Sequence, residues 1–239
     1  MKAMIFAAGL GTRLKPFTAS APKALAKVGD KTLLECSIKY LQRFGIYDVI
    51  VNVHHFAEMI TTAVTDANGF GSNVTLSNER DCLLDTGGGL KKVSSFFDKE
   101  ACYVVMNVDV LTTLDVGKMI TNHITGNAQA TLAVIKRKSG RHLLFDNDMR
   151  LCGWKNNTTN EVKIVKDNSP LQEYAFTGIQ ILSNSIWRNQ PFEGKFSIID
   201  LYLHLAKTQL INGYDHTNDI FIDAGTPESL EKASGIFGV

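Results

Sequence analysis

Apolar and polar positions alternate along the first half of the chain with two different periods. The apolar run at 2–7 predicts a first strand, and the β-branched run Asp48–Val53 and the apolar run at 102–106 predict two more. Residues 74–77 predict a further short strand. Helix-like segments separate these runs, and this alternation favours a parallel sheet with right-handed crossovers.

The predicted helices are marked by their ends. Thr32 and Glu35 have the spacing of a capping box, the apolar residues at 34, 38 and 41 share one face, and Gly45 closes the helix. Residues 56–67 predict a second helix. The glycine-rich segment 85–89 is expected to be a loop that opens a helix running to about residue 97. Near the C-terminus, Thr226 is expected to cap a last helix with Pro227 at its first position.

The second half is expected to contain strands at 129–135 and 175–182, a hairpin or loop at 156–160, and a last short strand, Phe221–Asp223. No internal repeat, low-complexity tract or linker interrupts the chain. We therefore predict a single domain over residues 1–239. Its fold class would be α/β, with a Rossmann-like, mixed but mainly parallel sheet flanked by helices.

Composition and charge narrow the choice of partners. Of the 239 residues, 44% are hydrophobic and 21% are charged, which is ordinary for a soluble globular protein. The formal net charge is +1 without a basic face or tail, so we expect no nucleic-acid partner. No apolar stretch approaches the length of a membrane span, and the N-terminal run is too short for a signal peptide, so we expect no membrane partner.

Four widely spaced cysteines, Cys36, Cys82, Cys102 and Cys152, form no C-x-x-C pair. A reducing compartment is favoured over a disulfide framework, and a structural zinc site is disfavoured. Cys102 lies in an apolar run and is expected to be a small buried thiol. We expect a cytoplasmic protein, either a monomer or a homodimer.

Candidate chemistry begins where the first strand ends, because ligands of open α/β sheets gather at the carboxyl ends of the strands. In Gly9-Leu10-Gly11-Thr12-Arg13, two glycines let backbone N–H groups approach a polyphosphate, and Arg13 adds a donor fork for phosphate oxygens. A dinucleotide fingerprint needs glycine where Leu14 stands, which disfavours a dinucleotide-dependent oxidoreductase. Taken alone, the segment could equally be a plain strand-to-loop turn.

Three charged residues extend this candidate site. Lys23 follows the rigid Pro22 and supplies a point charge suited to a phosphate. Asp109 and Asp223 each follow an apolar strand, and two carboxylates at one sheet edge can hold Mg²⁺ together with water and phosphate. Taken singly, an aspartate at a strand end is more often a turn or capping residue.

The motifs taken together resemble those of the nucleotide-sugar pyrophosphorylases, also called sugar-1-phosphate nucleotidyltransferases. Residues 1–25, MKAMIFAAGLGTRLKPFTASAPKAL, match the N-terminal signature of that family. The resemblance continues through LDTGGG at 84–89, N-x-D at 107–109, FTGI at 176–179 and IDAGT at 222–226, and so covers nearly the whole chain. The T-G-G-G loop and the short chain are most similar to the branch that acts on N-acetylmuramate 1-phosphate with UTP.

The resemblance implies that a nucleoside triphosphate and a sugar 1-phosphate are joined, with release of pyrophosphate and with Mg²⁺ as cofactor. It implies catalytic roles for Arg13, Lys23, Asp109 and Asp223, with Asp109 and Asp223 as the metal ligands. The implied nucleotide-binding residues are Ala8, Gly9, Gly11, Thr12, Arg13, Lys23, Asp85, Gly87 and Gly88. Backbone groups around Gly87 and Gly88 would face the base, and Asn107, Thr177 and Gly178 would line the sugar site.

Two departures from the family pattern affect the choice of substrate. Val108 stands where the family usually has a small residue, and it would either crowd the sugar or point into the core. The segment 161–163 gives no convincing match to the acidic motif that many relatives place near the sugar. UTP with N-acetylmuramic acid 1-phosphate is the favoured pair. Mannose-1-phosphate guanylyltransferase and CTP-dependent phosphocholine cytidylyltransferase remain alternatives, as does a non-catalytic regulatory protein that binds sugar nucleotides.

Overall fold

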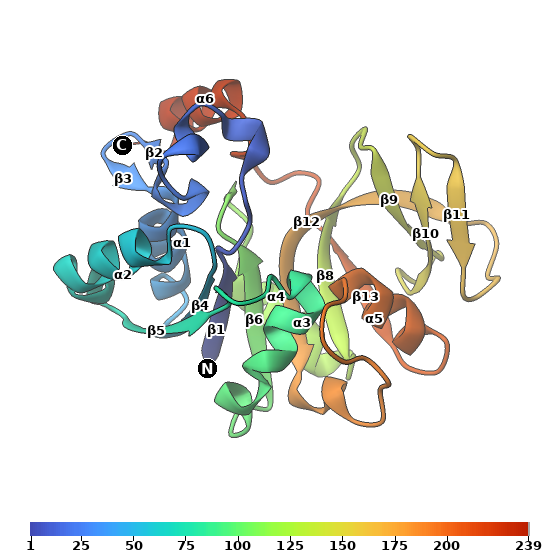
Figure 1. Cartoon of the computed structure of the whole chain (residues 1–239). Coiled ribbons are helices and arrows are strands. Elements are labelled where there is room, and N and C mark those ends of the chain that lie inside the picture. The colour runs from blue at the N-terminus through green and yellow to red at the C-terminus, as the bar shows by residue number, and fades with distance from the viewer. Residues whose placement is uncertain (239) are drawn as a thin grey trace. The chain divides into compact units, whose positions relative to one another are not determined.

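The N-terminal apolar run forms strand β1 (Lys2–Phe6) in the computed structural model of the chain, which describes residues 1–238 (Figure 1). β1 lies between β4 (Asp48–Val53) and β6 (Cys102–Asn107), and β5 (Asn73–Asn78) extends the sheet beyond β4. All these strands are parallel, as the alternation of strand and helix predicts. Phe6 is in register with Asn52 and with Asn107, so neighbouring strands end at one edge of the sheet.

The described residues divide into two compact units. Unit 1 comprises Met1–Leu84, Tyr103–Thr113 and the C-terminal segment from Ile220, and unit 2 comprises Asp85–Cys102 and Leu114–Asp219. A single domain over the whole chain stays a prediction.

Three helices accompany the parallel sheet of unit 1: α1 (Leu33–Gln42), α2 (Ala57–Asp66) and α6 (Pro227–Phe237). The Thr32 hydroxyl accepts from the Glu35 amide at 3.1 Å, so the predicted cap of α1 is confirmed. The predicted apolar face of α1, at 34, 38 and 41, is buried. Thr226 caps α6 in a full capping box with Ser229, and Pro227 takes its first position as predicted.

Short elements complete unit 1. Two small antiparallel pairs join β2 (Lys27–Val28) to β3 (Lys31–Thr32) and β7 (Val110–Thr112) to β14 (Phe221–Asp223). Four 3₁₀ turns occur at η1 (Thr12–Leu14), η2 (Phe17–Ala19), η3 (Lys23–Leu25) and η4 (Asn68–Gly71).

Unit 2 is built around the long strand β12 (Gln172–Ser183), which pairs antiparallel with β8 (Ala130–Ile135) and β9 (Arg141–Phe145). β13 (Ile211–Asp215) runs parallel to β8, and β10 (Leu151–Asn156) and β11 (Glu161–Ile164) form a hairpin beside β9. The helical elements of unit 2 are α3 (Asp85–Lys92), η5 (Ser94–Phe97), α4 (Val116–Thr125), η6 (Asn184–Trp187) and α5 (Ile198–Ala206).

Two expectations about local structure need correction. The segment 85–89 is not a loop before a helix, because α3 already begins at Asp85 and ends at Lys92, before the 3₁₀ turn η5. Helices α4 and α5 were not predicted, although each begins at a capping side chain, Asp115 for α4 and Ser197 for α5. The predicted fold class, α/β with a mixed sheet flanked by helices, is confirmed, with the parallel strands concentrated in unit 1.

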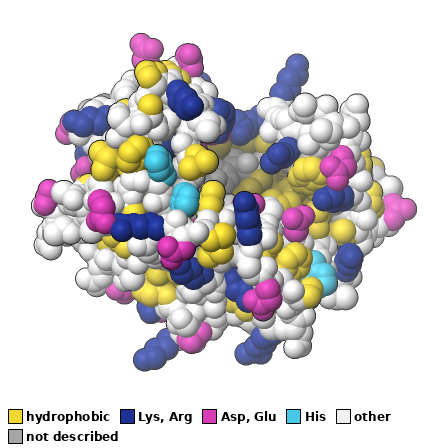
Figure 2. All heavy atoms as spheres, in the orientation of Figure 1, with side chains coloured by type: hydrophobic (Ala, Val, Ile, Leu, Met, Phe, Trp, Pro, Cys, Tyr) yellow, Lys and Arg dark blue, Asp and Glu magenta, His cyan; other side chains and the backbone are white. Residues whose placement is uncertain are grey.

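Several features noted in the sequence have a clear place in the fold. All four cysteines are free, and Cys102 is buried as expected. Within residues 1–238, no helix has both the length and the apolar character needed to cross a bilayer. On the face shown in Figure 2, Lys and Arg side chains are interspersed with Asp and Glu, in keeping with the formal net charge of +1.

Candidate active site

The glycine-rich segment after β1 is held at both of its ends. The amides of Ala7 and Ala8 donate to Oδ1 of Asn52 at 2.8 and 3.3 Å, which fixes the exit of the chain from β1. Further on, the Gly11 carbonyl accepts from the Leu14 amide at 2.8 Å and from the Thr18 hydroxyl at 2.9 Å. The segment is therefore a preorganised turn rather than a loose loop.

Glycine is required at position 11 for two physical reasons. Its φ of +61° lies in the left-handed region, and a Cβ there would come within 2.8 Å of the Thr18 side chain and 3.0 Å of the Lys23 side chain. At Gly9, by contrast, a Cβ would meet no atom within 4 Å, so open space lies beside the backbone. Gly9 thus leaves its backbone accessible to a ligand, whereas Gly11 sets the turn.

Lys23 and Asp109 form an ion pair from two distant parts of the sequence. Lys23 begins the 3₁₀ turn η3, Asp109 lies between β6 and β7, and the Lys23 ammonium contacts Oδ2 of Asp109. The side chains are only 11% and 18% exposed, so the pair is largely withdrawn from water. Two of the predicted catalytic residues are therefore in direct contact.

Arg13 and Asp223 form a second pair, which is more open to solvent. Arg13 Nη2 lies 3.5 Å from Asp223 Oδ2, and the Arg13 side chain is 62% exposed. An ion pair so exposed contributes little to stability, which leaves the guanidinium available to a charged ligand. Gly225 keeps this contact possible, because a Cβ there would lie 2.7 Å from both Arg13 Nη2 and Asp223 Oδ1.

The backbone brings Asp109 and Asp223 to the same place. Asp223 ends β14 in register with Val110 of β7, and the Ala224 amide donates to the Asp109 carbonyl at 2.8 Å. Unit 1 therefore holds all four predicted catalytic residues, and the two aspartates lie on adjoining backbone segments.

The two carboxylates suit a magnesium ion. Asp223 Oδ1 is buried and accepts no hydrogen bond from residues 1–238, so it keeps a coordinating lone pair. Within the same residues there is no cluster of three or more His, Cys, Asp or Glu side chains placed to hold a metal. Mg²⁺ commonly binds one or two carboxylates and completes its shell with water and substrate phosphate, so the pair fits this cation.

Asn107 and Val108 occupy the end of β6. Asn107 is partly exposed at the strand end, as a ligand-binding side chain would be. Val108 is 4% exposed, and its carbonyl oxygen lies 3.1 Å from the buried Ser37 hydroxyl. Of the two positions considered for this valine, the structure shows the one in the core.

Two buried polar residues that were not predicted from the sequence support the glycine-rich segment after β1. Asn52, which holds Ala7 and Ala8, donates from Nδ2 to Oε1 of Glu79 at 2.8 Å. Oε2 of Glu79 accepts from the Leu84 amide at 3.2 Å, and both side chains are at most 3% exposed. In the sequence, Asn52 stood out only as a polar residue inside an apolar strand, and Glu79 carried no signal.

In unit 2, the glycines of the T-G-G-G segment pack against Phe196. The amides of Gly87 and Gly88 both donate to the Phe196 carbonyl, at 3.0 and 3.3 Å, and a Cβ on Gly87 would overlap the Phe196 ring. The Thr86 hydroxyl accepts from the Ile198 amide at 3.0 Å. Asp85 is exposed, with a φ of +61°, and its Oδ1 accepts from the Thr86 amide at 2.6 Å. The expected role of Gly87 and Gly88 at the base stays a prediction, because here their amides bind within the chain.

Thr177 and Gly178 lie at an irregularity of β12. Thr177 is 3% exposed, and its hydroxyl contacts the Ala133 carbonyl at 2.9 Å and His216 Nε2 at 3.0 Å. Gly178 has a φ of +88°, a conformation that favours glycine. The Thr177 hydroxyl is thus engaged within the chain, and contact of this segment with a sugar stays a prediction.

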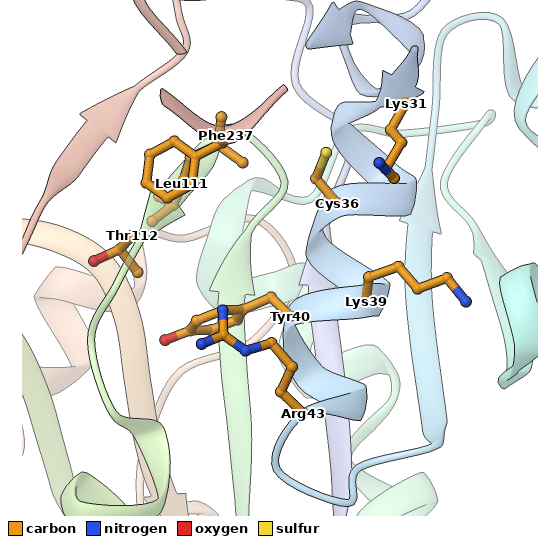
Figure 3. Close-up of a pocket in the computed structure, with 9 residues that line it drawn as sticks. Lys31, Cys36, Lys39, Tyr40, Arg43, Leu111, Thr112 and Phe237 are labelled. Carbon is orange, nitrogen blue, oxygen red and sulfur yellow. The ribbon is translucent and has the colours of Figure 1, made fainter. Parts of the chain in front are cut away.

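A pocket of about 180 Å³ beside α1 is lined by none of the predicted site residues. Its lining residues are Lys31, Cys36, Lys39, Tyr40, Arg43, Val110, Leu111, Thr112 and Phe237. In Figure 3, Arg43 lies against Tyr40, whereas Lys39 extends away from Leu111 and Phe237. Lys39 Nζ donates to the Phe70 carbonyl at 2.9 Å, and the Arg43 guanidinium lies 6.0 Å from the centre of the Tyr40 ring.

Several known proteins are similar to this chain over nearly its whole length. The N-acetylmuramate alpha-1-phosphate uridylyltransferase of Caulobacter vibrioides is 26% identical over 95% of this chain and 93% of its own length. The D-glycero-alpha-D-manno-heptose 1-phosphate guanylyltransferase of Aneurinibacillus thermoaerophilus is 28% identical over 98% and 96%. The crystal structure of HddC from Yersinia pseudotuberculosis superposes with a TM-score of 0.80 at 25% identity, covering 99% of both chains.

A family model decides the assignment. The model described as Nucleotidyl transferase matches residues 2–145, which is more than half of the chain and includes the glycine-rich segment after β1, Lys23 and Asp109. The match agrees with the resemblance of the motifs and with the contacts of the matched residues. The chain belongs to the Nucleotidyl transferase family.

Proposed function

We propose that the chain transfers a nucleoside monophosphate from a nucleoside triphosphate to a sugar 1-phosphate and releases pyrophosphate. One observation carries the proposal: two basic residues pair with two aspartates whose backbones adjoin. Lys23 contacts Asp109, Arg13 lies 3.5 Å from Asp223, and the Ala224 amide binds the Asp109 carbonyl. Such a set combines donors for phosphate oxygens with ligands for Mg²⁺.

The reaction needs no nucleophile from the protein. An oxygen of the sugar phosphate forms a bond to the α-phosphorus, the bond from that phosphorus to the bridging oxygen breaks, and its electron pair leaves with pyrophosphate. The chain orients the reactants and offsets negative charge. Lys23 would donate to the α-phosphate, Arg13 to the departing phosphates, and the turn at Gly9 and Gly11 would bind phosphate through the backbone.

Asp109 and Asp223 would hold the Mg²⁺ ion, which supplies positive charge next to the phosphates when it is bound. The buried Oδ1 of Asp223, which accepts no hydrogen bond from residues 1–238, supports this assignment. Asn107, Thr177 and Gly178 would contact the sugar phosphate, and Asp85, Gly87 and Gly88 would lie near the base.

UTP and N-acetylmuramic acid 1-phosphate are the proposed substrates. Two relatives named N-acetylmuramate alpha-1-phosphate uridylyltransferase, from Caulobacter vibrioides and Neisseria meningitidis, are 26% and 27% identical over 95% and 100% of this chain. A guanylyltransferase is the second candidate. Two relatives named D-glycero-alpha-D-manno-heptose 1-phosphate guanylyltransferase are 28% and 29% identical over 98% and 95% of this chain.

A screen of pyrophosphate release tests the proposal. The four common nucleoside triphosphates would each be combined with Mg²⁺ and with N-acetylmuramic acid, heptose, mannose and glucose 1-phosphates, and with phosphocholine. We expect the fastest release from UTP with N-acetylmuramic acid 1-phosphate. Preference for GTP with the heptose or mannose ester would move the assignment to a guanylyltransferase, and preference for CTP with phosphocholine to a cytidylyltransferase. No release from any pair would favour the non-catalytic sugar-nucleotide-binding protein.

A further inference from the structure

His216 is a buried histidine of unit 2 that directly contacts a predicted sugar-binding residue. It follows β13, its side chain is 0% exposed, and its Nε2 lies 3.0 Å from the Thr177 hydroxyl oxygen. The backbone fixes its position, because the His216 amide donates to the Val134 carbonyl at 3.0 Å and its carbonyl accepts from the Asp219 amide at 2.9 Å.

Thr177 lies where the pairing of β12 with β8 is interrupted. Phe176 is in register with Val134 and Gln180 with Leu132, so the three residues 177–179 stand opposite the single residue Ala133. Such a bulge leaves ladder groups unpaired and redirects the strand. The Thr177 hydroxyl donates to the Ala133 carbonyl at 2.9 Å, and Gly178 takes a φ of +88°.

The hydrogens available in this cluster determine which ring nitrogen of His216 is protonated. A hydroxyl has one hydrogen, and that of Thr177 is donated to the Ala133 carbonyl. The contact at 3.0 Å therefore requires His216 Nε2 to carry a hydrogen and to donate it to the Thr177 oxygen. Burial lowers the pKa of His216, although the carboxylates of Asp219 and Asp215 act in the opposite direction. With its pKa lowered in this way, the histidine at neutral pH is the uncharged tautomer with its hydrogen on Nε2.

We propose that His216 is a positioning residue for the sugar 1-phosphate: its Nε2–H holds the Thr177 hydroxyl, which fixes the bulge that carries the proposed sugar-binding segment at 177–178. This inference rests on the proposed function. The histidine fixes the bulge through one directed hydrogen bond. Because a small displacement of groups that orient a substrate is costly, loss of this bond should weaken binding of the sugar phosphate.

His123 is a matched control within the same unit. It is also buried, with 2% exposure, and its ring nitrogens contact the hydroxyls of Thr131 at 2.9 Å and Ser183 at 3.1 Å. Thr131 belongs to β8, as Ala133 does, but neither hydroxyl belongs to the predicted sugar segment. Loss of His123 thus reproduces the loss of a buried histidine without touching Thr177.

The test compares His216→Phe, His216→Gln and His123→Phe with the unchanged chain. Rates of pyrophosphate release would be measured with UTP, Mg²⁺ and N-acetylmuramic acid 1-phosphate, varying each substrate in turn. We expect His216→Phe to raise the KM for the sugar phosphate about tenfold, with a small change in the KM for UTP. His216→Gln should recover most of this loss, because the glutamine amide places a donor near the position of Nε2. His123→Phe should lower the melting temperature and leave the sugar KM unchanged.

A second measurement depends on no turnover. With ¹⁵N-labelled histidine, the ring nitrogen shifts of His216, assigned by their absence in His216→Gln, should show a protonated Nε2 and an unprotonated Nδ1. The opposite tautomer, or an unchanged sugar KM in a folded His216→Phe, would overturn the positioning role while leaving the proposed function in place. If the unchanged chain releases no pyrophosphate from any pair in the screen, the proposed function fails and this role fails with it.

Discussion

The Lys23 ammonium contacts Oδ2 of Asp109 although 86 residues separate the two in the chain. The contact joins the segment proposed to bind phosphate to the end of β6, where a proposed metal ligand lies. Both side chains are largely buried, so each one holds the other in place. The most direct predictions concern the residues on either side of this contact.

Replacing Lys23 or Arg13 by alanine should lower kcat by on the order of 10²–10³, the usual cost of a lost donor to developing charge. Lys27→Ala removes an exposed lysine of β2 and serves as a control that should leave kcat unchanged. Steady-state kinetics with thermal melts would check the pattern. Near-normal turnover by a folded Lys23→Ala would remove its role at the α-phosphate.

Asp109 and Asp223 should act as one unit. Each change to asparagine keeps the shape but removes a charge, so either should largely abolish turnover. The double change should cost little more than the worse single one, because one site is being dismantled. The measurement is kcat for both single variants and the double variant across a Mg²⁺ titration. Fully multiplicative losses, or activity that survives chelation of the metal, would contradict a shared ion.

Gly87 should be required for packing against Phe196. Gly87→Ala forces a methyl group into the Phe196 ring and is expected to cost about 2–3 kcal/mol of unfolding free energy. In a Phe196→Ala background that cost should fall without vanishing, since the Phe196 carbonyl also lies 2.9 Å from the new carbon. Denaturant unfolding of the single and double variants measures the coupling. Gly235→Ala, at an exposed helix position with open space, is the control and should not destabilise the chain. Equal costs of Gly87→Ala in both backgrounds would refute this packing role.

Asn52 should matter to stability and to nucleotide binding together. Asn52→Ala leaves the Ala7 and Ala8 amides and a carboxylate oxygen of Glu79 without their partner, which should cost about 2–4 kcal/mol. The KM for UTP should rise as the turn loosens. Asn73→Ala removes an exposed amide bonded to Asp48 and is expected to change both quantities little. An unaltered KM for UTP in Asn52→Ala would show that the hydrogen bonds of Asn52 serve stability alone.

His123 makes stability depend on pH. Burial lowers its pKa to about 4, from an ordinary value of 6.5. The unfolded chain therefore takes up a proton on this histidine before the folded chain does, so stability is present above 6.5 and is lost as the pH falls toward 4. Between roughly pH 7 and roughly pH 5 the loss should be about 2 kcal/mol. Denaturant unfolding at several pH values, with His123→Gln for comparison, would show a shallower slope in the variant, and identical slopes would exclude this source.

The strand ends and the charged residues of the candidate site could be predicted because their signals are local. The apolar runs before Ala7, Asn107 and Asp223 each mark a strand, and the register of the parallel strands β1 and β6 places the ends of the first two at one edge. Asp223 reaches Asp109 by a different route, the antiparallel pairing of β14 with β7, which brings the Ala224 amide to the Asp109 carbonyl.

Residues whose role depends on a distant partner could not be predicted. Asn52 and Glu79 carry no motif, and their function becomes visible only once β4 and β5 lie side by side. The glycine at 87 was predicted for contact with the base, whereas its close neighbour is Phe196, which no periodicity in the sequence relates to it. The same holds for His216 and Thr177, which a strand bulge brings into contact.

Unit 1 is built from three separate segments of the sequence, so its parts become available at different times during synthesis on the ribosome. Strand β14, which carries Asp223, and helix α6, whose Ser234 hydroxyl accepts from the Gly29 amide, come from the last segment of this unit, starting at Ile220. The residues of the Lys23–Asp109 contact are synthesised early, but β7 waits for its partner strand until residues 221–223 have been translated. A nascent chain or a fragment that stops before Ile220 would therefore lack β14 and, with Asp223, half of the proposed metal site.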